Sequence, residues 1–111
     1  MYIETLTLYT CSVADLLIIN KNSNAANYNR ALRGKEVKKA INACKNACRL
    51  HNVKYSKSIK VIVTIMMQHD QDDCEEHYRC VIDFCDLKNS RATIDISKAD
   101  FKKYCFVHKA A

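Results

Sequence analysis

Positively charged side chains are concentrated in one part of this 111-residue sequence. Residues 21–60 contain eleven lysines and arginines and one acidic residue, whereas the rest of the chain contains seven basic and eleven acidic residues. A local excess of positive charge attracts polyanions, because ammonium and guanidinium groups bind phosphates. The residues of this segment that we expect to bind phosphate groups are Arg30, Arg33, Lys35, Lys38, Lys39, Lys45, Arg49 and Lys57.

The chemistry of these cations favours contact with a nucleic-acid backbone. Lysines outnumber arginines 13 to 5, and an ammonium group lacks the planar fork of arginine, so we expect backbone and shape recognition rather than base reading. Tyr28 and Tyr55 lie in the same segment, and tyrosine rings stack on unpaired bases. We therefore expect binding to nucleic acid, RNA rather than DNA. The alternative is a solvated lysine face that keeps a small domain soluble.

The spacing of two cysteines and a histidine suggests a zinc site. Cys44, Cys48 and His51 fall on one side of a predicted helix, and zinc prefers thiolate and imidazole ligands. However, the sequence has no C-x2-C pair of the kind that zinc ribbons and knuckles use. Val37 and Ile41 lie on the same side of the helix, so burial in the core is the other explanation. We expect no metal and no cofactor, and zinc binding by these three residues is the alternative.

An acidic segment covers residues 69–77, with five carboxylates, two histidines and Cys74. A calcium loop needs a glycine at its sharp turn and a spaced terminal glutamate, and this segment has neither. We expect a charged turn between two strands. The alternatives are adventitious binding of divalent cations, masking of the basic segment and self-association through opposite charges.

The sequence lacks the motifs of a nucleotide-binding loop or a catalytic centre. Its single glycine, Gly34, excludes G-x-G-x-x-G and Walker-type loops. Each cysteine except Cys74 lies on or beside a predicted apolar stripe, and the carboxylates around Cys74 disfavour a reactive thiolate. The paired carboxylates are confined to one loop, whereas catalysis needs rigidly held groups. We predict that the protein is not an enzyme.

The seven cysteines help to predict the cellular compartment of the protein. An odd number cannot pair completely within one chain, and the N-terminal residues do not resemble a secretory signal. We therefore expect mostly buried, reduced thiols and a cytoplasmic protein that is not secreted. No apolar run approaches 18 residues, so we expect no membrane segment.

A long helix predicted over residues 34–51 positions most of the cations. At 100° per residue, one side of this helix carries Val37, Ala40, Ile41, Cys44, Ala47, Cys48 and His51. The opposite side carries Lys35, Lys38, Lys39, Asn42, Lys45, Asn46 and Arg49. One side is therefore expected to face the core, and the other is basic except for Glu36.

Alternating apolar residues predict strands over residues 2–10, 59–67 and 77–87, and a short strand after a turn at Asn89-Ser90. In the first strand, Leu6 and Leu8 are expected on one face, and Thr5, Thr7 and Tyr9 on the other. The inward residues of the other strands are predicted to be Ile59, Val61, Val63, Ile65, Met67, Tyr78, Cys80, Ile82, Phe84, Ala92, Ile94 and Ile96.

Three further segments have weaker patterns. Ser12 and Asp15 favour a helix start, but Leu16 to Ile19 also suits a buried strand, so both remain open. Residues 20–30 are rich in asparagine and are expected to form a loop. Ser97 is expected to cap a helix that buries Phe101, Tyr104, Cys105 and His108, and a terminal strand is the alternative.

These elements predict an α+β fold. We expect a mainly antiparallel sheet of about four strands with one long helix packed on one face and a short C-terminal helix, in a single domain over residues 1–111. The leading functional hypothesis is a small accessory protein that binds RNA. The alternative is a protein-interaction module, such as a viral factor that engages a host protein or a subunit of a larger assembly. Its partner would be an acidic protein surface, a strand added at residues 2–10 or 91–96, or a second copy in a homo-oligomer.

Overall fold

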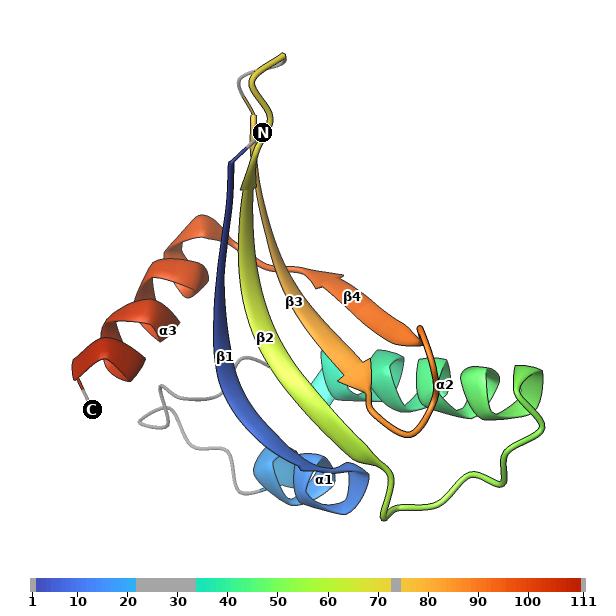
Figure 1. The fold of residues 1–111 in the computed structure, drawn as a ribbon. Helices are drawn as coiled ribbons and strands as arrows, with labels where there is room; N and C mark the ends of the chain where they lie inside the picture. The colour runs from blue at the N-terminus through green and yellow to red at the C-terminus, as the bar shows by residue number, and fades with distance from the viewer. Residues whose placement is uncertain (1, 22–33, 73–74, 111) are drawn as a thin grey trace.

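The computed structural model describes residues 2–21, 34–72 and 75–110 and has an α+β fold. One four-stranded antiparallel sheet has the strand order β1-β2-β3-β4 (Figure 1). The elements follow in the order β1 (Tyr2–Ser12), α1 (Val13–Lys21), α2 (Gly34–Leu50), β2 (Lys60–His69), β3 (Glu76–Phe84), β4 (Arg91–Asp95) and α3 (Lys98–Ala110). The predicted sheet, long helix and C-terminal helix are therefore confirmed.

The two central strands bury one face almost completely. In β2, Val61, Val63 and Ile65 have no exposed surface, and the intervening Ile62 is half-buried. In β3, Cys80 and Ile82 are equally buried and belong to the same apolar cluster. The predicted alternation of these strands is confirmed, and it places the core on one side of the sheet's centre.

Strand β1 contains an irregularity that its composition did not reveal. Leu8 is buried and Thr7 is exposed, as expected. However, the register shifts between Thr7 and Tyr9, so that Leu6 pairs with Ile65 and Tyr9 pairs with Val63. This β-bulge adds one residue to β1 relative to β2. The side chain of Tyr9 lies outside the described residues, so its place on the face of Thr7 stays a prediction.

The segment after β1 is a helix, which decides between the two possibilities left open for it. The hydroxyl of Ser12 accepts a hydrogen bond from the Asp15 N–H (3.2 Å), and the Asp15 carboxylate accepts one from the Ser12 N–H (3.2 Å). This reciprocal pair satisfies donors that the first turn of α1 would otherwise leave free. Leu16 of α1 is buried in the core, so the helix also gains stability from packing.

Helix α2 begins at the predicted residue, ends one residue earlier than predicted, and buries apolar residues of the predicted side, including Val37, Ala40 and Cys44. Its nearest neighbours are β4, at the sheet edge, and α1. Packing of this helix along a single face of the sheet stays a prediction. After Leu50 the chain turns, and Asn52 adopts a φ of 56°, a left-handed conformation common after helices.

His51 is exposed, so its predicted place on the buried side of α2 is wrong. The residue follows the end of the helix, and the chain turns away from the core there. Its Nε2 atom lies 3.2 Å from the hydroxyl oxygen of Ser90, in the turn before β4. Asn89 in that turn has a φ of 60°, which confirms the predicted turn.

The last element is helix α3. The hydroxyl of Ser97 accepts a hydrogen bond from the Asp100 N–H (3.0 Å), which confirms the predicted cap. Phe101 and Tyr104 are buried, and the Phe101 ring lies 5.1 Å from the Tyr78 ring between centroids. The side chain of His108 lies outside the described residues. Within the described ranges, no helix combines the length and apolar content that crossing a bilayer requires.

Candidate nucleic-acid interface

Five cations lie along the exposed side of α2, and we call them the α2 basic face. Their side chains are all exposed, whereas the opposite side of the helix is buried in the core. With a rise of about 1.5 Å per residue, the face extends roughly 21 Å along the helix. The helix therefore holds a row of positive charges on a rigid element. The residues are Lys35, Lys38, Lys39, Lys45 and Arg49.

The α2 basic face has no acidic partner among the described residues. None of its five side chains forms an ion pair with a described carboxylate. The single acid of the helix, Glu36, is half-buried, and its Oε2 atom is buried. Burial and, secondarily, the Glu36 carboxylate raise the pKa of Cys80 to about 12, so this carboxylate lies on the sheet side of α2.

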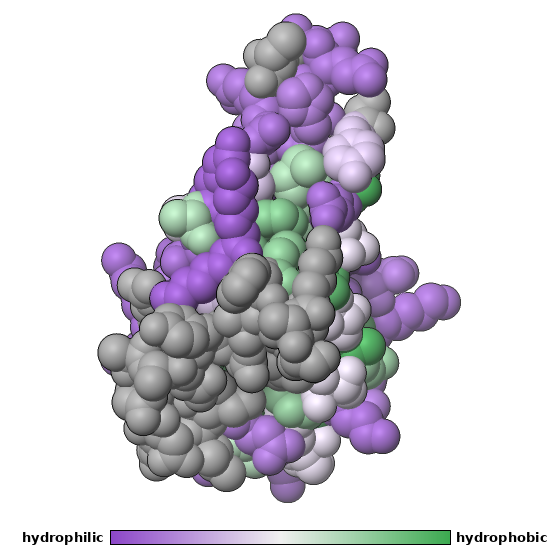
Figure 2. Space-filling view, turned by 90° about the vertical axis from the view of Figure 1, so that its left-hand side faces the viewer, coloured by the Kyte–Doolittle hydropathy of each residue, from purple (hydrophilic) through white to green (hydrophobic). Residues whose placement is uncertain are grey.

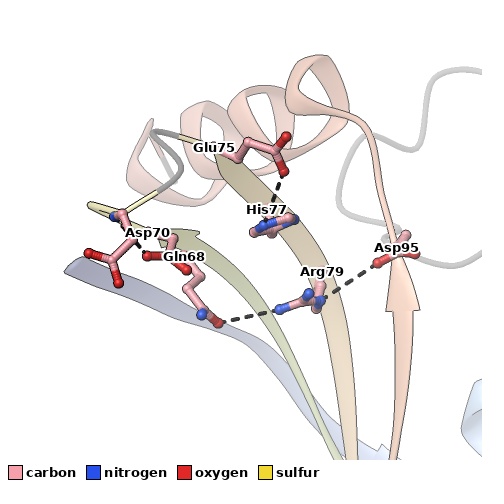
Figure 3. A network of polar contacts seen from close by, with 7 residues as sticks. Gln68, Asp70, Glu75, His77, Arg79 and Asp95 are labelled. Atoms are coloured by element: carbon pink, nitrogen blue, oxygen red, sulfur yellow. Dashed lines mark hydrogen bonds and ion pairs between the residues drawn. The ribbon is translucent and has the colours of Figure 1, made fainter. Parts of the chain in front are cut away.

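The two arginines of the sheet differ from Arg49 of α2 because each has a carboxylate partner. The Nε atom of Arg79 lies 3.6 Å from Asp95 Oδ1, and its Nη1 atom donates a hydrogen bond to Gln68 Oε1 at 3.3 Å (Figure 3). The Nε atom of Arg91 lies 3.6 Å from Asp83 Oδ1. The positive charge of the sheet is therefore largely neutralised locally, and that of α2 is not.

The described part of the acidic segment lies far from the α2 basic face. It forms the tip of the β2–β3 hairpin, at the opposite end of the sheet from α2 (Figure 1). The polar groups of this tip contact one another. Asp70 N–H donates to the Glu75 carbonyl at 3.0 Å, and Glu75 lies 3.8 Å from His77 Nε2 (Figure 3). Masking of the basic face by these residues is therefore not observed.

Tyr55 contacts the α2 basic face from the loop that follows the helix. Its ring is half-buried against the core, and the Lys45 ammonium lies 5.2 Å from the ring centre. This cation–π contact occupies part of the ring that a base would need for stacking. Tyr55 therefore orients a cation of the α2 basic face, and stacking of its ring on a base stays a prediction.

The remaining predicted residues lie elsewhere. Lys57 is exposed, but its carbonyl accepts a hydrogen bond from the Ala14 N–H at 2.9 Å, so it lies beside the start of α1 and not on α2. Arg30, Arg33 and Tyr28 fall outside the described residues. The structure therefore brings five of the predicted phosphate-binding residues together on one helix.

The cysteines of α2 are core residues. Cys44 and Cys48 are buried, and burial together with the neighbouring Cys48 raises the pKa of the Cys44 thiol to about 11. His51 is directed to Ser90 instead. Within the described ranges, no three histidine, cysteine or acidic side chains are grouped so that they could hold a metal ion.

Asn46 was placed on the basic side of the helix, but its contact with Arg49 was not predicted. The amide oxygen of Asn46 accepts a hydrogen bond from Arg49 Nη2 at 2.8 Å, which holds the guanidinium along the helix. Their spacing of three residues on an exposed helix side is the signal that could have revealed the pair.

Comparison with known proteins finds no family model that matches the chain, no similar curated protein and no similar solved structure.

Proposed function

We propose that the protein is a small cytoplasmic accessory protein that binds nucleic acid through the α2 basic face. The observation that supports this most directly is the row of five exposed cations, none of which forms an ion pair with a carboxylate of the described residues. Releasing the counter-ions of a phosphate backbone provides the free energy for such binding. The contacts are electrostatic and position the backbone, so affinity depends weakly on base sequence.

RNA is the preferred ligand in this proposal. Asn42 and Asn46 are exposed between the cations of α2, and their side-chain amides can donate hydrogen bonds to 2′-hydroxyl groups. The 2′-hydroxyl is the group by which a protein distinguishes RNA from DNA. We expect Asn42→Ala to reduce the preference for RNA over DNA of the same sequence, measured by fluorescence anisotropy.

The salt dependence of binding tests the electrostatic part of the proposal. If five to six phosphates are neutralised, the logarithm of the association constant should fall with the logarithm of salt concentration with a slope of about −4 to −5. The triple variant Lys38→Glu, Lys45→Glu and Arg49→Glu should lose detectable binding at physiological salt. An affinity that does not change with salt contradicts the proposal.

A matched control separates the α2 basic face from net charge. The variant Lys88→Glu, Lys102→Glu and Lys103→Glu has the same change in charge, and all three residues are exposed outside α2. This control should retain most of the affinity, because its lysines do not contribute to the contact. Equal losses in the two triple variants would show that overall charge, not the α2 basic face, attracts the RNA.

The second candidate is a protein-interaction module. It is favoured by the strand order, because the two segments expected to accept a partner strand, β1 and β4, form the two edges of the sheet. The α2 triple variant distinguishes the two functions. Loss of RNA retention with unchanged binding to a protein partner supports the first, and the converse result supports the second.

A further inference from the structure

Within the part of the chain that the structure describes, no strand pairs with the peptide groups on the outer side of β1. The Val13 N–H donates to the Ile59 carbonyl at 2.9 Å, so Ile59 directs its peptide group toward β1. Peptide groups along a strand alternate in direction, so Ile65, six residues after Ile59, also directs its peptide group toward β1. Leu6 pairs with Ile65, so the peptide group of Leu6 is directed toward β2. It follows that the peptide groups directed outward, before the bulge, are those of Ile3, Thr5 and Thr7.

The composition of β1 favours pairing with another strand. It has eleven residues and a single charged side chain, Glu4. The edge residues Tyr2 and Ile3 are 56% and 47% exposed. Native proteins usually protect a long edge with several charges or with proline. Before its bulge, β1 has no proline and only one charged residue, Glu4. The opposite edge, β4, has five residues and charged ends at Arg91 and Asp95.

Helix α3 provides a cover for an added strand. Phe101 packs on Tyr78, a residue of the core face, so α3 lies on that face of the sheet. In Figure 1 the helix continues past β1 toward the C-terminus. Figure 2 looks onto this edge, where apolar and nearly neutral side chains are visible between hydrophilic ones. Among the described residues, no strand pairs with β1 on this side.

We propose that β1 pairs with β1 of a second copy of this chain, in an antiparallel dimer whose two-fold axis passes beside Thr5. In this register Thr5 faces its own symmetry mate, and Ile3 faces Thr7. All the outward peptide groups before the bulge then form hydrogen bonds, and the two sheets become one of eight strands. The inference concerns β1 and does not depend on nucleic-acid binding by α2.

A second copy fits this edge better than a charged peptide does. Because β1 has one charged residue, it offers no charge pattern by which a charged partner could be selected. In the proposed register Glu4 lies opposite Leu6, so like charges do not face each other directly. Threonine pairs across strands and the partner's apolar side chains beside α3 add favourable contacts.

Charged residues introduced at position 5 test the register in the 111-residue chain. Sedimentation equilibrium should show a reversible dimer for the unaltered protein. Thr5→Lys should raise the dimer dissociation constant about five- to tenfold at low salt, because two ammonium groups face each other at the axis. Thr5→Glu should do the same, and an equimolar mixture of the two variants should form heterodimers. Failure of the mixture to associate overturns the proposed register.

Proline variants at the two sheet edges provide a matched pair. Thr5 and Thr93 are both exposed on edge strands, in β1 and β4. Thr5→Pro removes an outward N–H and should give a monomer, whereas Thr93→Pro should remain dimeric. Circular dichroism establishes that each variant is folded. A protein that is monomeric at every concentration, or a dimer lost only with Thr93→Pro, overturns the proposal.

Discussion

The ammonium group of Lys45 lies 5.2 Å from the centre of the Tyr55 ring, which joins the exposed side of α2 to the loop that follows it. The ring packs on the core, while the lysine remains exposed. The pair therefore fixes one cation of the α2 basic face relative to the body of the protein. Burial raises the pKa of Tyr55 above its usual value, so the ring stays neutral at physiological pH.

The two members of this pair should affect binding differently. Lys45→Met removes a phosphate contact, so the slope of binding against salt should become less negative by about 0.9. Tyr55→Phe keeps the ring and should leave the slope unchanged. Fluorescence anisotropy with one RNA at several salt concentrations measures both slopes. A change of slope in Tyr55→Phe would show that the phenol itself contacts the ligand.

The start of α1 depends on Ser12. Because its hydroxyl caps the helix and is bonded to Asp15, Ser12→Ala should lower the free energy of unfolding by about 1 kcal/mol. Urea denaturation followed by circular dichroism measures the change. The neighbouring Thr10→Ala, at an exposed position of β1, is the control and should change stability less. A cap that contributes nothing would leave the two variants equal.

Stability should decrease in alkaline solution because buried thiols resist ionisation. Burial raises the pKa of Cys80 from 9.0 to about 12 and that of Cys44 to about 11. The unfolded chain releases these protons above pH 9, whereas the folded chain retains them, so the free energy of unfolding falls as pH rises from 9 toward 12. Chemical denaturation at several pH values should show this decrease. Cys80→Ala should make it shallower, and an unchanged slope would exclude Cys80 as its source.

Acid should loosen the attachment of α3 to the hairpin. Hydrogen bonds from Tyr78 and Lys98 lower the pKa of Glu76, and the Lys98 Nζ atom lies 3.3 Å from its Oε2 atom. The stabilising effect is present above the carboxyl's ordinary pKa and is lost as pH falls through the lowered one. The protection factors of the α3 amides against hydrogen exchange should therefore decrease in acid. Glu76→Gln should remove this dependence on pH, and a decrease of equal size in that variant would point to another group.

Local patterns were sufficient for most of the elements. The period of 3.6 residues in α2 and the alternation in β2 reflect a single buried side, and burial of Val37 and Val61 dominates the energetics there. The cap at Ser97 was predictable because its partner, Asp100, is three residues away. The exposure of Lys38 and Lys45 followed from the same helical period.

Other features arise from contacts between residues distant in sequence, which no local pattern encodes. The bulge at Leu8 follows from the pairing of β1 with β2, and Tyr55 contacts Lys45 because its loop folds back onto α2. His51 left the core side because the chain turns at Asn52. Periodicity establishes which side chains can share a surface. Strand pairing and loop packing determine which charged side chains have an oppositely charged neighbour, because that depends on distances between elements.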